Sequence, residues 1–485
     1  MTISKSNKTI GMVILHNDLR IHDNATLLKA STVCDSLLIV YPKQKLFLPT
    51  QNRGQEFHAS QHEKMGKARA WFLLQSLSNL DKSLQQLGNG LLYLDAEKAG
   101  VTTFNQIKTL INEFNVGHVF VSSTADYDQN QGYRLLAQNT NTQWYYATTH
   151  SIYETRPTET LPKVFTEFRK LVEKSHPCLT AKNDLLISPT PSVLPSMPVM
   201  AANYLKSVQL PKILDVANSD FDNADIAELA DNQSITSPFI GGEHQALAHL
   251  QSYFQSDAPK TYKETRNTLF LNDDTTTQAS WSQTTRFAPW LANGSLSVRV
   301  LLNRLRQYER EKVANDSTYW IWFELLWREY FYWYANTHGK KLFRMRGISG
   351  KPSRKCFYGE RYERWKNGST PYPIVNACMK QLKATGYMSN RGRQLVASCF
   401  IHELGLDWRY GASYFEQQLI DYDVASNWGN WQYLAGVGAD PRGSRKFNLD
   451  KQTQQYDPEG KFIKKWGGND DATVLDSVDM VDWYV

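Results

Sequence analysis

Four short apolar runs in the first quarter of the chain constrain its fold more than any other feature. They span residues 11–15, 36–41, 90–94 and 117–122, and a helical pattern covers 68–87 between the second run and the third. Short apolar runs that alternate with helical segments are typical of a parallel sheet with crossover helices. We therefore predict a Rossmann-like parallel α/β domain at the amino terminus.

The chain changes character after a polar stretch with several prolines at 181–237. Amphipathic helical segments follow, and 12 of the 14 tryptophans lie after residue 270. A length of 485 residues also exceeds what one core usually organises. We predict an α/β plus all-α protein, with an α/β domain at 1–175, a linker at 176–237 and a helical domain at 238–485. The clearest predicted helices are 297–311, 319–336, 373–385 and 392–403.

Composition and charge narrow the function only slightly. With 41% hydrophobic and 21% charged residues, the chain has the composition of a globular protein. Its net charge of +6 is compatible with a nucleic-acid partner. The segment between His338 and Lys366 contains ten Lys or Arg residues and two acidic residues. A solvated loop would explain this local excess equally well.

The five cysteines are widely scattered and form no Cys-x-x-Cys pair. This pattern indicates neither a disulfide framework nor a zinc site, and a reducing cytoplasm fits it best. The polar start does not resemble a signal peptide, and no apolar run is long enough to span a bilayer. We expect a cytoplasmic monomer with no metal site and no membrane contact.

One predicted helix carries a carboxylate beside an indole. Within 319–334, helical spacing places Glu324, Trp327, Arg328 and Phe331 on one face. A carboxylate on an apolar helix is costly to bury without a partner. Glu324 could form a structural ion pair with Arg328, or it could hydrogen-bond a base that stacks on Trp327.

Two later segments concentrate polar and aromatic side chains. In 385–393, Asn390, Arg391 and Arg393 could hold an anionic group, with glycines allowing close backbone approach, although the segment alone is a generic helix entry. Segment 421–433 combines two acids, two asparagines and several aromatic residues. A metal site is the rival interpretation there, but two carboxylates without a histidine support it weakly.

Taken together, these segments resemble the FAD-binding domain of photolyases and cryptochromes. The resemblance runs from Asp18–Asn24 to Tyr456–Gly460 and includes Phe239–Glu243 and Thr284–Leu291. Long motifs in collinear order are more specific than any one of them. The features similar to the cryptochrome-DASH branch are Tyr262–Asn267, Met388–Gln394, Tyr433 in place of a tryptophan, and Gly436–Arg442.

The resemblance implies FAD bound in the helical domain. The residues that it places along the phosphates, the ribityl chain or the adjoining motif are Tyr262, Thr284, Thr285, Arg286, Phe287, Ala288 and Arg328. Arg393 and Asp421 match an ion pair flanking the isoalloxazine, and Asp423 matches a carboxylate near its reducible ring. Asn427 matches the residue facing flavin N5, where an amide can donate or accept a hydrogen bond. Ala288 replaces the usual serine and removes one hydrogen bond, which backbone amides or water could supply.

The same resemblance implies a cavity for a flipped-out cyclobutane pyrimidine dimer. Its lining residues would be Glu324, Trp327, Met388 and Asn390. Damage weakens pairing and stacking, so extrusion costs less at a lesion and still less in a single strand. Tyr433 offers a smaller stacking platform than tryptophan. We therefore expect a light-driven deoxyribodipyrimidine photolyase of DASH type that prefers single-stranded DNA.

Photoreduction of oxidised flavin in this family uses a chain of tryptophans. Trp431 and Trp408 match its first two members. The third position falls near Lys355, which cannot be oxidised in this way. Phe357 is a poor relay, and Tyr358 could take the place of the missing tryptophan.

The amino-terminal half resembles the antenna domain, which in this branch usually carries 5,10-methenyltetrahydrofolate. Asp126 stands where a pterin-binding glutamate is typical, and Val164–Lys170 resembles a segment of the same domain. A shorter carboxylate could still bond a pterin. We expect this folate as the second chromophore.

Three other functions compete with DNA repair. A signalling cryptochrome photoreceptor shares the fold, but the short stretch after Gly460 argues against a switch driven by an extension. A (6-4) photoproduct lyase would need a histidine pair that has no counterpart around Met388 and Ser389. A Rossmann dehydrogenase would need Gly-x-Gly-x-x-Gly after the first strand, and that motif is absent.

Overall fold

The computed structural model describes residues 9–43, 65–96, 99–175, 184–199, 201, 237–269, 284–351, 357–439 and 443–472. Lys355, the last three residues of the Gly436–Arg442 motif and most of the predicted linker lie outside these ranges.

A parallel five-stranded sheet forms the amino-terminal layer. The strand order is β3-β2-β1-β4-β5, and every neighbouring pair is parallel. The four predicted strands are confirmed. The fifth was missed because it is a half-exposed edge strand without an apolar run. The strands are β1 Ile10–Ile14, β2 Ser36–Pro42, β3 Leu91–Leu94, β4 His118–Ser122 and β5 Gln143–Ala147.

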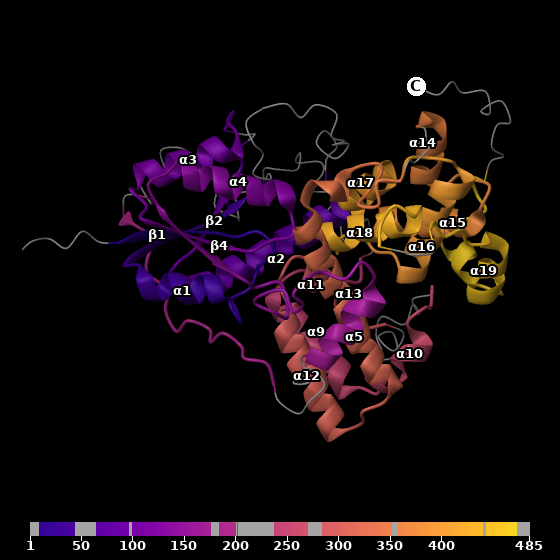
Figure 1. Ribbon diagram of the computed structural model, residues 1–485, viewed down its shortest axis with the longest axis horizontal. Helices are drawn as coiled ribbons and strands as arrows, with labels where there is room; N and C mark the ends of the chain where they lie inside the picture. The colour runs from indigo at the N-terminus through magenta and orange to yellow at the C-terminus, as the bar shows by residue number, and fades with distance from the viewer. Residues whose placement is uncertain are drawn as a thin grey trace, which may run out of the picture.

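Helices cover both faces of this sheet (Figure 1). Side chains alternate along each strand, so Met12 and Ile14 pack with α3 and α4, whereas Val13 and Leu15 pack with α1 and α2. Both faces are buried, as a parallel sheet requires. The four helices are α1 Ala25–Val33, α2 Lys67–Gln86, α3 Thr103–Glu113 and α4 Tyr127–Gln138.

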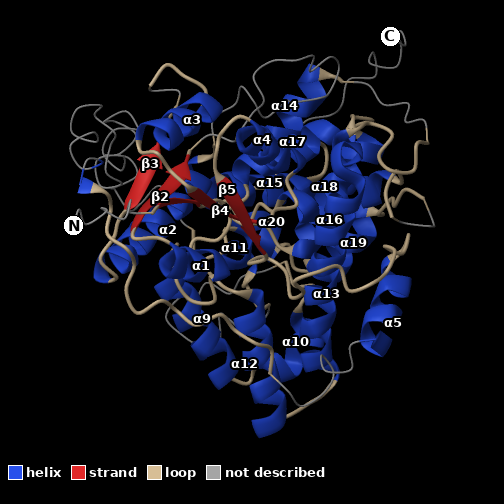
Figure 2. Cartoon of the chain, turned by 60° about the vertical axis from the view of Figure 1, so that its left-hand side comes forward, coloured by secondary structure: helices blue, strands red, loops and turns tan. Residues whose placement is uncertain are grey.

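The carboxyl-terminal part is helical, as predicted (Figure 2). All four predicted helices are present; the last is α16 continued by a π-helical turn at Cys399–Glu403. The α-helices are α5 Phe165–Ser175, α9 Glu243–Gln255, α10 Tyr262–Thr265, α11 Ala288–Ala292, α12 Val298–Glu311, α13 Asp316–His338, α14 Gly359–Asn367, α15 Pro373–Thr385, α16 Asn390–Ser398, α17 Trp408–Gln418, α18 Val424–Ala435, α19 Leu449–Tyr456 and α20 Lys461–Lys465, and 3-10 turns lie at Ala258–Thr261 and Gly339–Phe343.

Helix α5 precedes the predicted linker but packs with the helical part of the molecule. Figure 1 shows it beside α13, and Phe165, Phe168 and Val172 belong to the same buried cluster as the residues of α13. Tyr330 of α13 also donates its hydroxyl to the Lys163 carbonyl at 2.8 Å. The amino-terminal sequence therefore contributes directly to the helical core.

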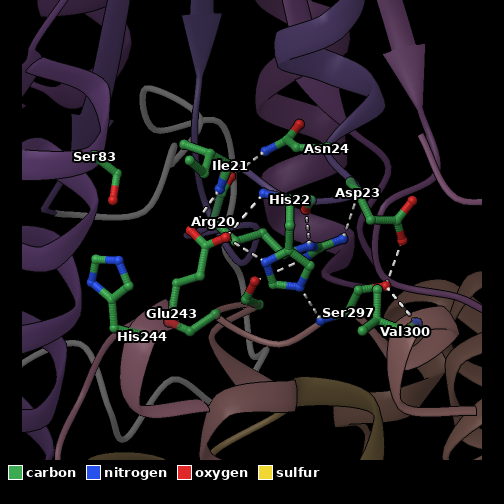
Figure 3. Close-up of polar contacts among 12 residues, drawn as sticks. Arg20, Ile21, His22, Asp23, Asn24, Ser83, Glu243, His244, Ser297 and Val300 are labelled. Carbon is green, nitrogen blue, oxygen red and sulfur yellow. Dashed lines mark hydrogen bonds and ion pairs between the residues drawn. The ribbon is translucent and has the colours of Figure 1, made fainter. Parts of the chain in front are cut away.

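The loop after β1 joins the sheet to the helical part through polar contacts, among them His22 with Glu243 and Asp23 with Ser297 (Figure 3). Arg299 donates to both carboxylate oxygens of Asp23, at 3.0 and 2.9 Å. The backbone amides of Ile21 and His22 donate to Glu243, and the His22 ring lies 2.5 Å from the same carboxylate. Burial alone would raise the pKa of Asp23, but hydrogen bonds from Arg299 and Ser297 outweigh it and lower the pKa. The contacts keep this carboxylate ionised and the loop fixed.

The buried Arg20 side chain also fixes this loop by hydrogen bonds to the backbone. This side chain is fully buried and donates to the backbone carbonyls of Gly294 at 2.8 Å and Thr149 at 2.7 Å. Gly294 has a φ of +75°, and a Cβ there would come within 1.9 Å of the Asn17 carbonyl oxygen. Only glycine permits this approach between the two parts of the chain.

No helix in the described ranges combines the length and apolar character that crossing a membrane needs. Within the same ranges, no three or more His, Cys, Asp and Glu side chains gather as a metal site would require.

Removing the Asp23 carboxylate tests the interdomain anchor. Asp23→Ala should lower the free energy of unfolding by about 3–5 kcal/mol, because it leaves the Arg299 guanidinium buried without its partner. Equilibrium urea unfolding measures this change. Asp184→Ala is the matched control, since Asp184 also pairs with an arginine but is 51% exposed, and its loss should stay within about 1 kcal/mol. Equal losses of unfolding free energy in the two variants would contradict a special role of the Asp23–Arg299 pair in joining the two parts.

Candidate functional site

Helix α13 supplies one wall of the candidate site. It begins in a capping box, in which Asn315 and Thr318 satisfy each other's backbone amides. Trp327 and Phe331 lie on one face of α13 with ring centroids 5.5 Å apart, and Glu324 stands one turn before Trp327. Against this face α18 packs closely at Gly429, where a Cβ would come within 2.4 Å of the Phe331 ring.

Glu324 forms an ion pair with Arg266, a residue just after α10. The alternative of a pair with Arg328 was wrong: Arg328 instead donates to the backbone carbonyls of His150 and Leu291. The Arg266 guanidinium also lies over the Trp320 ring at 4.0 Å. Desolvation raises the pKa of Glu324, and the Arg266 charge opposes that rise. With 33% of its side chain exposed, Glu324 is paired yet still accessible.

Helix α5 packs against one face of the Trp327 ring. The Phe165 ring stacks on it with centroids 3.8 Å apart and an interplanar angle of 12°. Tyr433 of α18 meets Trp327 edge-on at 6.0 Å, and the Arg445 guanidinium lies 4.6 Å above the Tyr433 ring. Nothing in the local sequence links Phe165 to Trp327; the contact arises from the packing of α5 on α13.

A second wall comes from α16 and the turn before α18. Ser389 caps α16 by accepting from the Gly392 amide at 3.1 Å. Arg393 donates from Nη2 to both oxygens of Asp421, at 2.9 and 2.7 Å, and from Nε to the carbonyl of buried Met388. The predicted ion pair is thus formed. Asn390 is exposed at the first residue of α16.

Asp423 is the N-cap of α18 and contacts a histidine from the amino-terminal part. Its carboxylate accepts from the Ser426 amide at 2.7 Å and lies 3.5 Å from Nε2 of His150. Burial lowers the pKa of His150 to about 4, against the opposing contact with Asp423. Burial alone would raise the pKa of Asp423, but contacts with His150 and Arg328 outweigh it and hold that pKa well below its usual range. At neutral pH the carboxylate is therefore ionised and the imidazole neutral.

The Thr284–Leu291 motif leads into α11, and its residues before that helix pack against α9. Arg286 is buried and adopts a φ of +51°, which is unusual for a residue other than glycine. The Thr285 carbonyl lies 2.8 Å from Nε2 of His249, and Phe287 packs against the same imidazole at 4.9 Å. Thr284 is half-buried and Ala288 exposed, whereas Tyr262 at the start of α10 is buried.

The two predicted redox tryptophans lie on neighbouring helices. Trp408 begins α17 and Trp431 lies on α18, both buried. Trp431 packs over Gly411, where a Cβ would come within 2.3 Å of the indole. Asn427, also on α18, donates its amide to the Ala412 carbonyl at 2.9 Å. Trp431 and Asn427 therefore face the same helix, one turn along from Trp408.

Comparisons with known proteins identify the family. Residues 320–469 match the FAD binding domain of DNA photolyase, and residues 12–192 match DNA photolyase. A cryptochrome DASH of Idiomarina loihiensis is 46% identical over 482 residues, which cover 98% of this chain and 96% of that protein. The chain belongs to the cryptochrome DASH family.

Solved structures of photolyases and cryptochromes share the fold. A Synechocystis cryptochrome matches with a TM-score of 0.74 and 34% identity, covering 94% of this chain and 88% of that one. A Sulfolobus tokodaii photolyase with two FAD molecules matches with a TM-score of 0.64 and 25% identity, covering 94% and 90% of the respective chains. The chain is thus a photolyase-like flavoprotein with an FAD-binding domain.

The geometry fits a polar, planar cofactor in that domain. Two buried hydroxyls without a hydrogen-bond partner among the described residues adjoin this site in sequence: Thr149 Oγ1 precedes His150, which contacts Asp423, and Ser413 Oγ follows Ala412, which accepts from Asn427. Buried polar groups are nearly always hydrogen-bonded. A ligand with polar edges would satisfy them beside the ionised carboxylate of Asp423.

Asp126, the expected pterin ligand, caps α4. Its carboxylate accepts from the backbone amides of Asp128 at 3.0 Å and Gln129 at 3.2 Å. The side chain is almost fully buried. Asp126 therefore has a structural role at the start of α4, whatever it binds.

The neutral His150 predicts a pH dependence of stability. Its folded-state pKa of about 4 lies below the ordinary 6.5, so the unfolded chain binds an extra proton between these values. Stability should therefore fall as pH drops from 6.5 to 4, by roughly 3 kcal/mol from this residue. Thermal unfolding at several pH values should give a shallower slope for His150→Gln. Exposed His244→Gln should keep the parent slope, and a parent slope in His150→Gln would contradict the assignment.

Proposed function

We propose that this flavoprotein repairs cyclobutane pyrimidine dimers in DNA under blue light, with a preference for single strands. Bound reduced FAD would supply the excited-state electron that splits the dimer. The observation that carries the proposal is an accessible carboxylate, Glu324, one helical turn before Trp327 on α13, together with Tyr433 of α18 edge-on to that indole. These are the groups that recognise an extruded base.

The cofactor would be held mainly by polar and ionic groups. In this proposal the Arg393–Asp421 pair flanks the flavin ring, Asp423 lies near its reducible part and Asn427 faces N5. The positive φ of Arg286 supports a specialised role, since strained backbone of this kind clusters at ligand sites. The remaining proposed contacts come from Arg328, Tyr262, Thr284, Thr285, Phe287 and Ala288.

Substrate entry would require Glu324 to change partner. Its carboxylate is paired with Arg266. A base that donates to Glu324 would compete with that arginine, while Met388 and Asn390 would line the opposite wall. Phe165 already covers one face of Trp327, so a base would use the remaining aromatic surface. Because a lesion in a single strand costs least to extrude, the single strand is the favoured substrate.

A second chromophore would collect light for the flavin. We propose methenyltetrahydrofolate, with Asp126 among its ligands, as the resemblance implies. The Sulfolobus tokodaii photolyase carries a second FAD instead, so the two chromophores are distinguished by the absorption spectrum. A near-ultraviolet folate band in the purified protein supports the proposal, and a spectrum with flavin bands alone contradicts it.

The substrate proposal is tested by Glu324→Ala. With chemically reduced flavin and a single-stranded oligonucleotide carrying one dimer, the variant should repair about 10- to 100-fold more slowly, since a buried polar contact to the base is lost. Flavin content, read from the absorption spectrum, should stay near that of the parent. Glu309→Ala, on α12 away from the site, is the control. Parent-like repair by Glu324→Ala would make the glutamate structural, and no repair by any form would favour a photoreceptor.

The photoreduction chain is tested by Trp431→Phe. The variant should almost lose light-driven reduction of oxidised flavin, because its first electron donor is missing. Repair after chemical reduction should be spared, because the flavin itself then supplies the electron. Trp144→Phe in the α/β part should behave like the parent in both assays. Normal photoreduction in Trp431→Phe would remove Trp431 from the chain.

A further inference from the structure

The Trp408 ring contacts an aromatic residue of α18. Its indole is 1% exposed and donates to the Met345 carbonyl at 3.1 Å. Within the described part of the chain one aromatic ring contacts it: Trp428 lies edge-on with centroids 5.8 Å apart. An electron hole on Trp408 thus has an oxidisable ring in direct contact.

The surroundings of Trp428 suit a positive charge on its ring. The indole N–H lies 3.3 Å from Oε2 of Glu416 on α17 and 3.3 Å from the hydroxyl of Tyr422. Trp428 is 3% exposed, so the Glu416 carboxylate acts on it with little screening by solvent. A carboxylate hydrogen-bonded to an indole stabilises its cation radical.

Tyr422 provides an end point for the hole. It is half-buried in the turn between α17 and α18, and its hydroxyl is hydrogen-bonded to the Trp428 N–H. The Arg69 guanidinium of α2 lies 4.7 Å above its ring. That cation disfavours a second positive charge on the phenol, so Tyr422 must lose its proton when it is oxidised. Glu416, which shares the same N–H, is the nearby base.

We propose that Trp428 and Tyr422 replace the missing third tryptophan in the photoreduction of this protein. The inference rests on the proposed function, in which photoexcited oxidised FAD is the oxidant. One electron passes from Tyr422 through Trp428, Trp408 and Trp431 to the flavin. The phenolic proton of Tyr422 passes to the Glu416 carboxylate, which leaves a neutral tyrosyl radical.

Tyr358 is the rival end point named from the sequence. The structure gives its ring a cation neighbour as well, since the Arg361 guanidinium lies over it at 4.8 Å. A neighbouring cation therefore does not distinguish Tyr358 from Tyr422 as the end point of the electron path. The direct Trp408–Trp428 contact and the hydrogen bond to Tyr422 favour the proposed branch.

The test is transient absorption of the FAD-loaded protein after a blue flash. In the parent, tryptophan cation absorption should give way to a tyrosyl band, and the conversion should slow in D₂O and in Glu416→Gln. Tyr422→Phe should lose the tyrosyl band and shorten the lifetime of the separated charge. Trp428→Phe should lose the same band. Tyr410→Phe, a half-buried tyrosine on α17 outside the branch, should match the parent.

These measurements distinguish Tyr422 from Tyr358 as the end point of the electron path. A parent-like signal in Tyr422→Phe, with the tyrosyl band lost in Tyr358→Phe, would overturn it. Electron paramagnetic resonance with ring-deuterated tyrosine checks the identity of the radical, and flavin content with circular dichroism checks folding of each variant. Failure of the proposed function is seen separately, as absent dimer repair by chemically reduced parent protein, because that assay does not use this electron path.

Discussion

The buried Asp23–Arg299 pair and the loop around it determine how the two parts of this flavoprotein fit together. The loop after β1 is fixed against α12 and α9. The contacts that fix it come from Arg20, Asp23 and the backbone amides of Ile21 and His22. Such a pair contributes more to a unique arrangement than to net stability, since desolvation offsets much of its attraction. The sheet is therefore a fixed support for the helical part.

That fixed arrangement brings amino-terminal residues into the site. His150 contacts Asp423 through its ring and accepts from Arg328 through its carbonyl, while Phe165 stacks on Trp327. Burial then sets the charges: it keeps His150 neutral beside an ionised carboxylate, and it desolvates Glu324 against Arg266. A site built only from the helical segment would lack both the imidazole and the aromatic support.

Local pattern predicted the elements that bury apolar surface, and it failed where long-range packing decides. Strands β1 to β4 and the faces of α12, α13 and α15 follow from the apolar pattern, whereas the half-exposed edge strand β5 has no such pattern. Helical spacing pointed from Glu324 to Arg328, because residues four apart are neighbours. The ion pair is instead formed with Arg266, which follows α10. Similarly, the match to Asp421 and Arg393 located an ion pair, but no local pattern indicated that Phe165 stacks on Trp327 or that His150 contacts Asp423.

The most direct measurement is a crystal structure of the protein with reduced FAD and a single-stranded oligonucleotide that carries one pyrimidine dimer. We predict the dimer extruded between α13 and α18, with Glu324 released from Arg266 and hydrogen-bonded to a base, and with Trp327 and Tyr433 against the rings. An oligonucleotide bound elsewhere, with the Arg266–Glu324 pair intact, would contradict the proposed repair site.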